Sequence, residues 1–191
     1  DMHSEYGLQA RTEATNIGFV KGLKTLFGSK VDIFALDPVS TRKLGVSPDV
    51  EVTIPYQAIN VDDILSLQEE LNLHQTAVEA AYLISTKYKQ DWLQVLLAQA
   101  DRLKEFAQEL GAHPESIAAL YRKLKRIEHL PFFVPGTMQK KNFSVIDQMI
   151  EYIDKGISII IEFGNYTSTF CYLLVANIIT RRIHTLYTQK T

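Results

Sequence analysis

The sequence lacks the features that mark disulfide-rich, membrane-spanning and secreted proteins. One cysteine, Cys171, in 191 residues excludes an intramolecular disulfide and a zinc site made only of cysteines. The longest apolar stretches, residues 157–161 and 171–179, are far shorter than the roughly 20 residues that span a bilayer. No charged start followed by an apolar run marks a secretory signal. We therefore expect a cytoplasmic protein without a membrane partner.

An excess of charge of one sign is also absent. Lys and Arg number 20 and Asp and Glu number 22, which gives a net charge of -2 and a pI of about 6.2. This balance excludes a surface that is basic throughout, although it leaves room for a local basic patch. Residues 121–126 (YRKLKR) are such a patch in sequence, and they suit either a nucleic-acid backbone or the solvated face of an amphipathic helix.

The familiar motifs for phosphate, dinucleotide, zinc and acyl chemistry are missing. The sequence contains no G-x-x-x-x-G-K-S/T, G-x-G-x-x-G, H-E-x-x-H or G-x-S-x-G, and its nine glycines do not cluster. The five histidines show no metal-ligand spacing, and Cys171 lies among apolar residues as expected of a buried thiol.

Periodicity divides the chain into three parts. Residues 1–59 contain a predicted helix at 17–27 and predicted strands at 31–36 and 50–54. Residues 60–130 repeat apolar residues at helical spacing and predict a bundle, with helices near 60–70, 72–88, 90–110 and 113–129. Residues 131–191 begin with a loop at 131–141 and continue as a helix to Lys155, an apolar parallel strand at 157–163 and a helix at 167–187.

The first candidate site is formed by Asp1, His3 and Glu5. A spacing of two places the three side chains on one face of an extended strand, where they can hold a divalent ion, position water or accept a proton. A chance run of polar residues at a terminus is the plainer interpretation. A third is a copper or nickel site made by a free terminal amine, two amide nitrogens and the His3 imidazole.

The second candidate site is the pair Arg181 and Arg182 near the end of the last predicted helix. Adjacent arginines can bind phosphate or carboxylate through paired hydrogen bonds. The alternative is that the two cations complement the dipole at a solvated helix end.

The opening run Asp-Met-His-Ser-Glu-Tyr resembles the D-x-H-x-E-Y signature of HerA-type ATPases, relatives of the FtsK translocases. The fourth residue is often Gly in that family and is Ser4 here. Further stretches resemble the family in the same order: 19–23, 26–28, the strand at 31–36, the helical insert at 60–130, 157–163, 174–177 and 181–183.

The resemblance implies a fold and an activity for the intact protein. The fold is a mainly helical α/β fragment, with a few strands of a RecA-like sheet and a helical-bundle insertion. The intact protein is expected to be a hexameric ring that hydrolyses ATP with Mg²⁺, moves along double-stranded DNA and works with a nuclease. Asp1 and Glu5 would lie at the edge of the nucleotide site with His3 in support, and Arg181 and Arg182 would face a neighbouring subunit or a phosphate.

The same resemblance implies that this chain begins after the phosphate-binding loop and ends before the Walker B strand. We therefore expect the chain alone to bind no cofactor and to lack catalysis. Sheet edges exposed by missing strands favour pairing with a second copy, which predicts a dimer. The competing function is a non-catalytic helical module that docks a partner protein, and a metal enzyme built on Asp1, His3 and Glu5 is a third alternative.

Overall fold

The computed structural model describes residues 6–7, 9–10, 20–45, 47–136 and 145–189. Its contacts divide the chain into two units. The first unit consists of Asp1–Thr53, Lys141–Tyr172 and Thr185–Thr191, and the second consists of Ile54–Lys140 and Leu173–His184. This division follows spatial contacts and not the order along the chain, so the boundaries at 59 and 130 stay a prediction.

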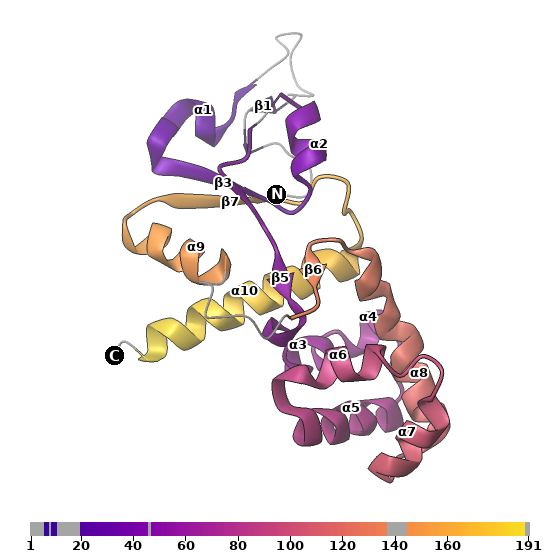
Figure 1. Cartoon of the computed structure of the whole chain (residues 1–191). Helices are drawn as coiled ribbons and strands as arrows, with labels where there is room; N and C mark the ends of the chain where they lie inside the picture. Colours follow the sequence, from indigo (N-terminus) through magenta and orange to yellow (C-terminus); the bar gives the residue numbers. More distant parts are fainter. Residues whose placement is uncertain (1–5, 8, 11–19, 46, 137–144, 190–191) are drawn as a thin grey trace. The chain divides into compact units, whose positions relative to one another are not determined.

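A three-stranded parallel sheet forms the framework of the first unit (Figure 1). β3 (Val31–Ala35) is the middle strand, with β4 (Val50–Glu51) on one side and β7 (Ser158–Glu162) on the other. β3 pairs with β7 along its whole length, from Val31 opposite Ser158 to Ala35 opposite Glu162. The strand predicted at 31–36 and the parallel strand predicted at 157–163 are thus confirmed.

Short helices and an apolar cluster complete the first unit. α2 (Pro38–Lys43) connects β3 to β4, and α9 (Val145–Asp154) leads into β7. Val31, Ile33 and Ile160 pack together, and the ring of Phe34 meets that of Tyr152 edge-on at 5.7 Å. β1 (Gln9–Ala10) pairs antiparallel with β2 (Val20–Lys21), which precedes α1 (Leu23–Phe27) and a 3-10 turn at Gly28–Lys30.

The second unit is a helical bundle, as predicted for this part of the chain. Its helices are α3 (Val61–Leu65), α4 (Gln68–Leu71), α5 (Gln75–Tyr88), α6 (Trp92–Leu97), α7 (Leu103–Leu110) and α8 (Pro114–Leu124). α8 packs against both α5 and α7. The buried Trp92 fixes the start of the bundle, because its indole N–H donates to the carbonyl of Ile59 at 2.9 Å.

A strand pair and a long helix join the bundle from other parts of the chain. β5 (Ile54–Pro55) pairs in parallel with β6 (Phe133–Val134). α10 (Thr169–Gln189) contributes Leu173–His184 to the second unit and its two ends to the first. None of the helices in the described part of the chain has the length and apolar character needed to cross a membrane. The fold is thus a mainly helical α/β fragment, as expected.

Non-local pairing overturns two predicted elements. The helix predicted at 17–27 is wrong over Val20 and Lys21, which pair with β1, and the helix begins at Leu23 after Gly22. The single strand predicted at 50–54 is two strands, since Val50–Glu51 pairs with β3 whereas Ile54–Pro55 pairs with β6. The loop predicted at 131–141 accordingly contains a strand.

Helix boundaries account for the remaining differences. The helix predicted at 90–110 is broken between Leu97 and Leu103, and Asp101, a weak helix former, lies in the break. The helix predicted at 60–70 is likewise divided into α3 and α4. α2 was not predicted from periodicity because it is only six residues long.

Candidate functional site

The carboxyl ends of β3 and β7 lie side by side in the first unit. The backbone N–H of Leu36, just after β3, donates to the carbonyl of Glu162 at 2.9 Å. In open parallel α/β sheets, ligands bind outside the carboxyl ends of the strands. An acidic residue stands at the end of each of these two strands. Asp37 follows Leu36 after β3, and Glu162 is the last residue of β7.

Asp37 accepts hydrogen bonds from the start of α2 and from the loop after β7. One carboxylate oxygen accepts from the backbone N–H of Ser40 at 3.0 Å, which caps α2, where Pro38 takes the first position. The other accepts from the backbone N–H of Asn165 at 3.3 Å and from its side-chain amide at 3.1 Å. The carboxylate thus ties the loop after β3 to the loop after β7.

Gly164 permits this close approach of the two loops. Its φ is +57°, and a Cβ at this position would lie 2.6 Å from the Cβ of Asp37. The neighbouring Tyr166 is partly buried, and burial raises the pKa of its phenol, with the negative charge of Asp37 as a smaller contribution in the same direction. The loop after β7 is therefore packed against a fixed negative charge.

Glu162 is buried and lies against the N-terminal segment. Only 2% of this residue is exposed, and a Cβ on Gly7 would lie 2.7 Å from its Oε1. The backbone of this segment is anchored, because the carbonyls of Tyr6 and Gly7 accept from the N–H groups of Leu23 and Lys24 at 2.7 and 3.1 Å. Tyr6 is the last residue of the Asp-Met-His-Ser-Glu-Tyr run, so this run leads directly to the carboxyl edge of β7.

Three of the predicted site residues belong to that run. Asp1, His3 and Glu5 lie outside the described residues, and their positions at the edge of a site stay a prediction. Within the described residues, no group of three or more His, Cys, Asp or Glu side chains has the geometry to hold a metal ion. What the described edge offers is a pair of carboxylates that can accept hydrogen bonds and orient water.

Arg181, one of the two arginines predicted as the second site, contacts residues of its own unit. Its Nε and Nη2 donate to the two carboxylate oxygens of Asp63, each at 2.8 Å, and Nη2 also donates to the carbonyl of Ala58 at 2.7 Å. Asp63 is 3% exposed and accepts a further hydrogen bond from the backbone of Asn60. This geometry joins α10 to the start of α3, whereas a phosphate-facing role for Arg181 and Arg182 stays a prediction.

Sequence reasoning missed Asp37, Glu162 and Asn165. Glu162 is the one charged residue in the apolar stretch 157–163, and Asp37 followed by Pro38 is a helix-start signal. Each of these two residues therefore carried a signal in the sequence. Asn165 carried none, because its role depends on a partner far away in sequence. Cys171 is buried as predicted, and burial raises the pKa of its thiol to about 12.

These features define an α/β domain with a parallel sheet, acidic residues at its carboxyl edge and a helical bundle. The chain matches the family described as the central domain of the helicase HerA over residues 1–183. It therefore belongs to this family, as the resemblance of its N-terminal run indicated. No curated protein and no solved structure matches the chain.

Proposed function

We propose that this chain is the central part of an ATP-driven motor that moves along double-stranded DNA. The family match over residues 1–183 carries the proposal. The anchored Tyr6 and Gly7 support it, because they bring the end of the acidic N-terminal run to Glu162 at the edge where parallel sheets bind ligands. Asp1 and Glu5, with His3 in support, then belong to the rim of the nucleotide site.

ATP and Mg²⁺ are the cofactors of the intact protein in this proposal. Magnesium-bound ATP supplies a γ-phosphoryl group that is transferred to water. Asp37 and Glu162 stand at the carboxyl edge of the sheet, where they would accept hydrogen bonds from the waters that Mg²⁺ retains. The lysine and Ser/Thr of a phosphate-binding loop are absent from the sequence, so the chain alone neither binds ATP tightly nor hydrolyses it.

Other copies of the protein are the main protein partners in this proposal. The resemblance supports a hexameric ring with Arg182 directed to a neighbouring subunit and a nuclease as a further partner. Arg181 reaches such a neighbour only if its pair with Asp63 opens. The isolated chain is expected to dimerise through exposed sheet edges.

A longer protein that includes the phosphate-binding loop and the Walker B strand provides the test. We would measure Mg²⁺-dependent ATP hydrolysis with and without double-stranded DNA. Glu162→Gln keeps the side-chain volume but removes the charge, and the expected result is a kcat at least tenfold lower with an unchanged KM for ATP. Asp1→Ala and Glu5→Ala should each lower hydrolysis as well.

Glu151→Gln is the matched control, because Glu151 is an exposed carboxylate on α9 in the same unit. It should leave both kinetic constants unchanged. A folded, oligomeric longer protein without ATP hydrolysis would contradict the proposal and leave the non-catalytic docking module as the better interpretation. Equal effects of Glu162→Gln and Glu151→Gln on ATP hydrolysis would show that the carboxyl end of β7 is not part of the nucleotide site.

A further inference from the structure

A run of basic residues lies at the end of α8. Four of the five residues from 122 to 126 are basic, and we call Arg122, Lys123, Lys125 and Arg126 the basic segment. It spans the last turn of α8 and the start of the 3-10 turn at Lys125–His129. Such a density of one charge is unusual in a chain whose net charge is -2.

The helix directs this segment to solvent and holds it firmly. Tyr121 and Leu124 are buried in the bundle, whereas Arg122, Lys125 and Arg126 are exposed and Lys123 is half-buried. Positions three and four apart are neighbours on a helix surface, with about 5–6 Å between their Cβ atoms. Arg122 and Lys125 therefore stand side by side on a rigid support.

Three cations of the basic segment, Arg122, Lys123 and Lys125, differ in their partners from other cations in the described part of the chain. Four cations outside the segment pair with carboxylates, and they are Lys24, Arg42, Arg102 and Arg181. Within the described residues, Arg122, Lys123 and Lys125 form no ion pair. Lys125 donates to the hydroxyl of Tyr121 at 2.9 Å, and this hydrogen bond is the main cause that raises the pKa of Lys125.

Two acidic residues, Glu128 and Asp101, lie near Lys125 without pairing with it in the described part of the chain. Their electrostatic effects on the pKa of Lys125 are smaller than that of the Tyr121 hydrogen bond, and within the described residues neither forms an ion pair with Lys125. Cations near a helix end also offset the helix dipole, which is a reason for some positive charge here. Offsetting the helix dipole does not require four cations within five residues, because the dipole effect is confined to the last turn and is equivalent to about half a charge.

We propose that the basic segment binds the phosphate backbone of a nucleic acid duplex. Closely spaced cations on a rigid helix suit a regular row of phosphates, and binding releases the counterions condensed on the duplex. The side chains of Arg122, Lys123 and Lys125 supply the contacts, without selecting a base sequence. The choice of duplex DNA as the ligand rests on the proposed function, whereas the position of the surface rests on the structure.

The test uses the whole chain and a fluorescently labelled DNA duplex at several salt concentrations. A triple variant, Arg122→Gln, Lys123→Gln and Lys125→Gln, removes three charges but keeps good helix formers. A control variant, Lys30→Gln, Lys43→Gln and Lys104→Gln, removes three exposed charges elsewhere. Far-ultraviolet circular dichroism and thermal melts establish that both variants are folded.

We expect the basic-segment variant to bind at least tenfold more weakly at low salt than the unchanged chain, with the control close to it. The slope of log affinity against log salt should fall by about two to three in magnitude, since each lost phosphate contact removes about 0.9. Equal weakening of both variants, or no binding by the unchanged chain, would overturn the proposal. Failure of ATP hydrolysis in the longer protein, with this DNA result intact, would contradict only the proposed motor.

Discussion

The two units of this chain are specified by different kinds of information in the sequence. In the second unit, α3 to α8 follow one another along the chain and pack on one another, as α8 does on α5 and α7. In the first unit, the central pairing places Val31 opposite Ser158, with the whole bundle between them in sequence. Local patterns thus account for the bundle, whereas the sheet depends on partners far apart.

The position of the acidic residues follows from this difference. Asp37 and Asn165 meet only because β3 and β7 are paired, and Gly7 reaches Glu162 from a third segment. Apart from the buried Asp63, the basic and acidic side chains discussed for the bundle lie on exposed helix faces, which periodicity already indicates. Chemistry at the sheet edge should therefore be sensitive to non-local packing, and charge on the bundle should not.

Matched core substitutions, one in each unit, should give the largest effects that test the difference between the two units. Ile33 in β3 and Ile117 in α8 are both fully buried. We expect Ile33→Ala to lower the free energy of unfolding by about 4 kcal/mol and Ile117→Ala by about 3 kcal/mol, since alanine favours a helix and not a strand. Hydrogen exchange should locate the first loss in β3 and β7 and the second in α5, α7 and α8. Equal loss of protection in both units would show that they unfold together and would break the comparison.

The predictable part of the structure is the part that depends on local signals. Asn60 begins α3 with acidic residues in the first turn, Pro114 begins α8 and Gly111 ends α7, all as sequence patterns indicate. Val20 and Lys21 belong to a strand because β1 pairs with them, although their spacing suits a helix. The candidate site was harder to predict from the sequence, because its geometry arises when three distant segments of the chain meet.

A buried ion pair provides a test within the bundle. Asp63 accepts from Arg181 and from the backbone of Asn60, so Asp63→Ala leaves the guanidinium without its carboxylate in a largely buried place. We expect a loss of about 3 kcal/mol in the free energy of unfolding, measured by urea denaturation. Asp62→Ala is the control, because Asp62 is exposed on the same turn and should cost about 0.5 kcal/mol or less.

This ion pair is one of the non-local contacts of the bundle, because Arg181 comes from α10, as does Asn177, which donates to the hydroxyl of Ser66. If Asp62→Ala costs as much as Asp63→Ala, the start of α3 is held by its own cap and dipole alone. The comparison between the two units would then be sharper, since α10 would add little to the bundle through this contact.

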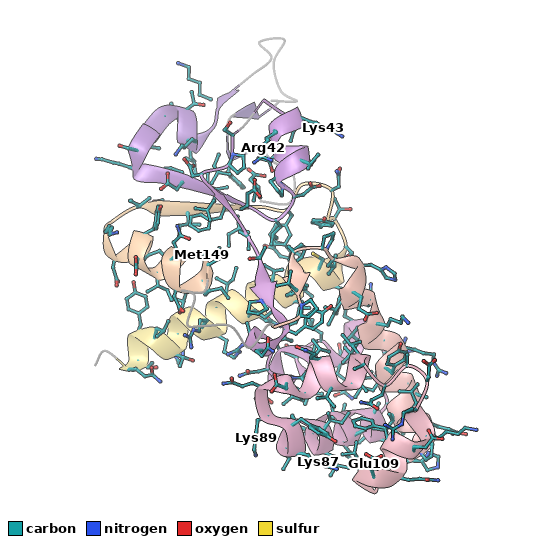
Figure 2. All side chains as sticks on the ribbon, viewed as in Figure 1. Arg42, Lys43, Lys87, Lys89, Glu109 and Met149 are labelled. Atoms are coloured by element: carbon teal, nitrogen blue, oxygen red, sulfur yellow. The ribbon has the colours of Figure 1, made fainter. Side chains whose placement is uncertain are left out.

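The smallest predicted effect concerns two helix ends with nearly the same backbone. Gly28 ends α1 with φ 55° and ψ -117°. Lys89, which is labelled in Figure 2, ends α5 with φ 53° and ψ -125°. Each N–H donates to the carbonyl four residues earlier, and a 3-10 turn follows each. The same turn is thus built once with the residue that suits it and once with a lysine.

Glycine adopts a positive φ without the steric cost that a Cβ brings, but it also has more freedom in the unfolded chain. The net expectation is that Lys89→Gly raises the free energy of unfolding by about 1 kcal/mol, and Gly28→Ala lowers it by about 1–2 kcal/mol. Thermal and urea unfolding of the two variants would measure both. Destabilisation by Lys89→Gly would mean that the lysine side chain stabilises the bundle by more than its backbone strain destabilises it. Local backbone conformation would then determine the second unit less than its helix pattern indicates.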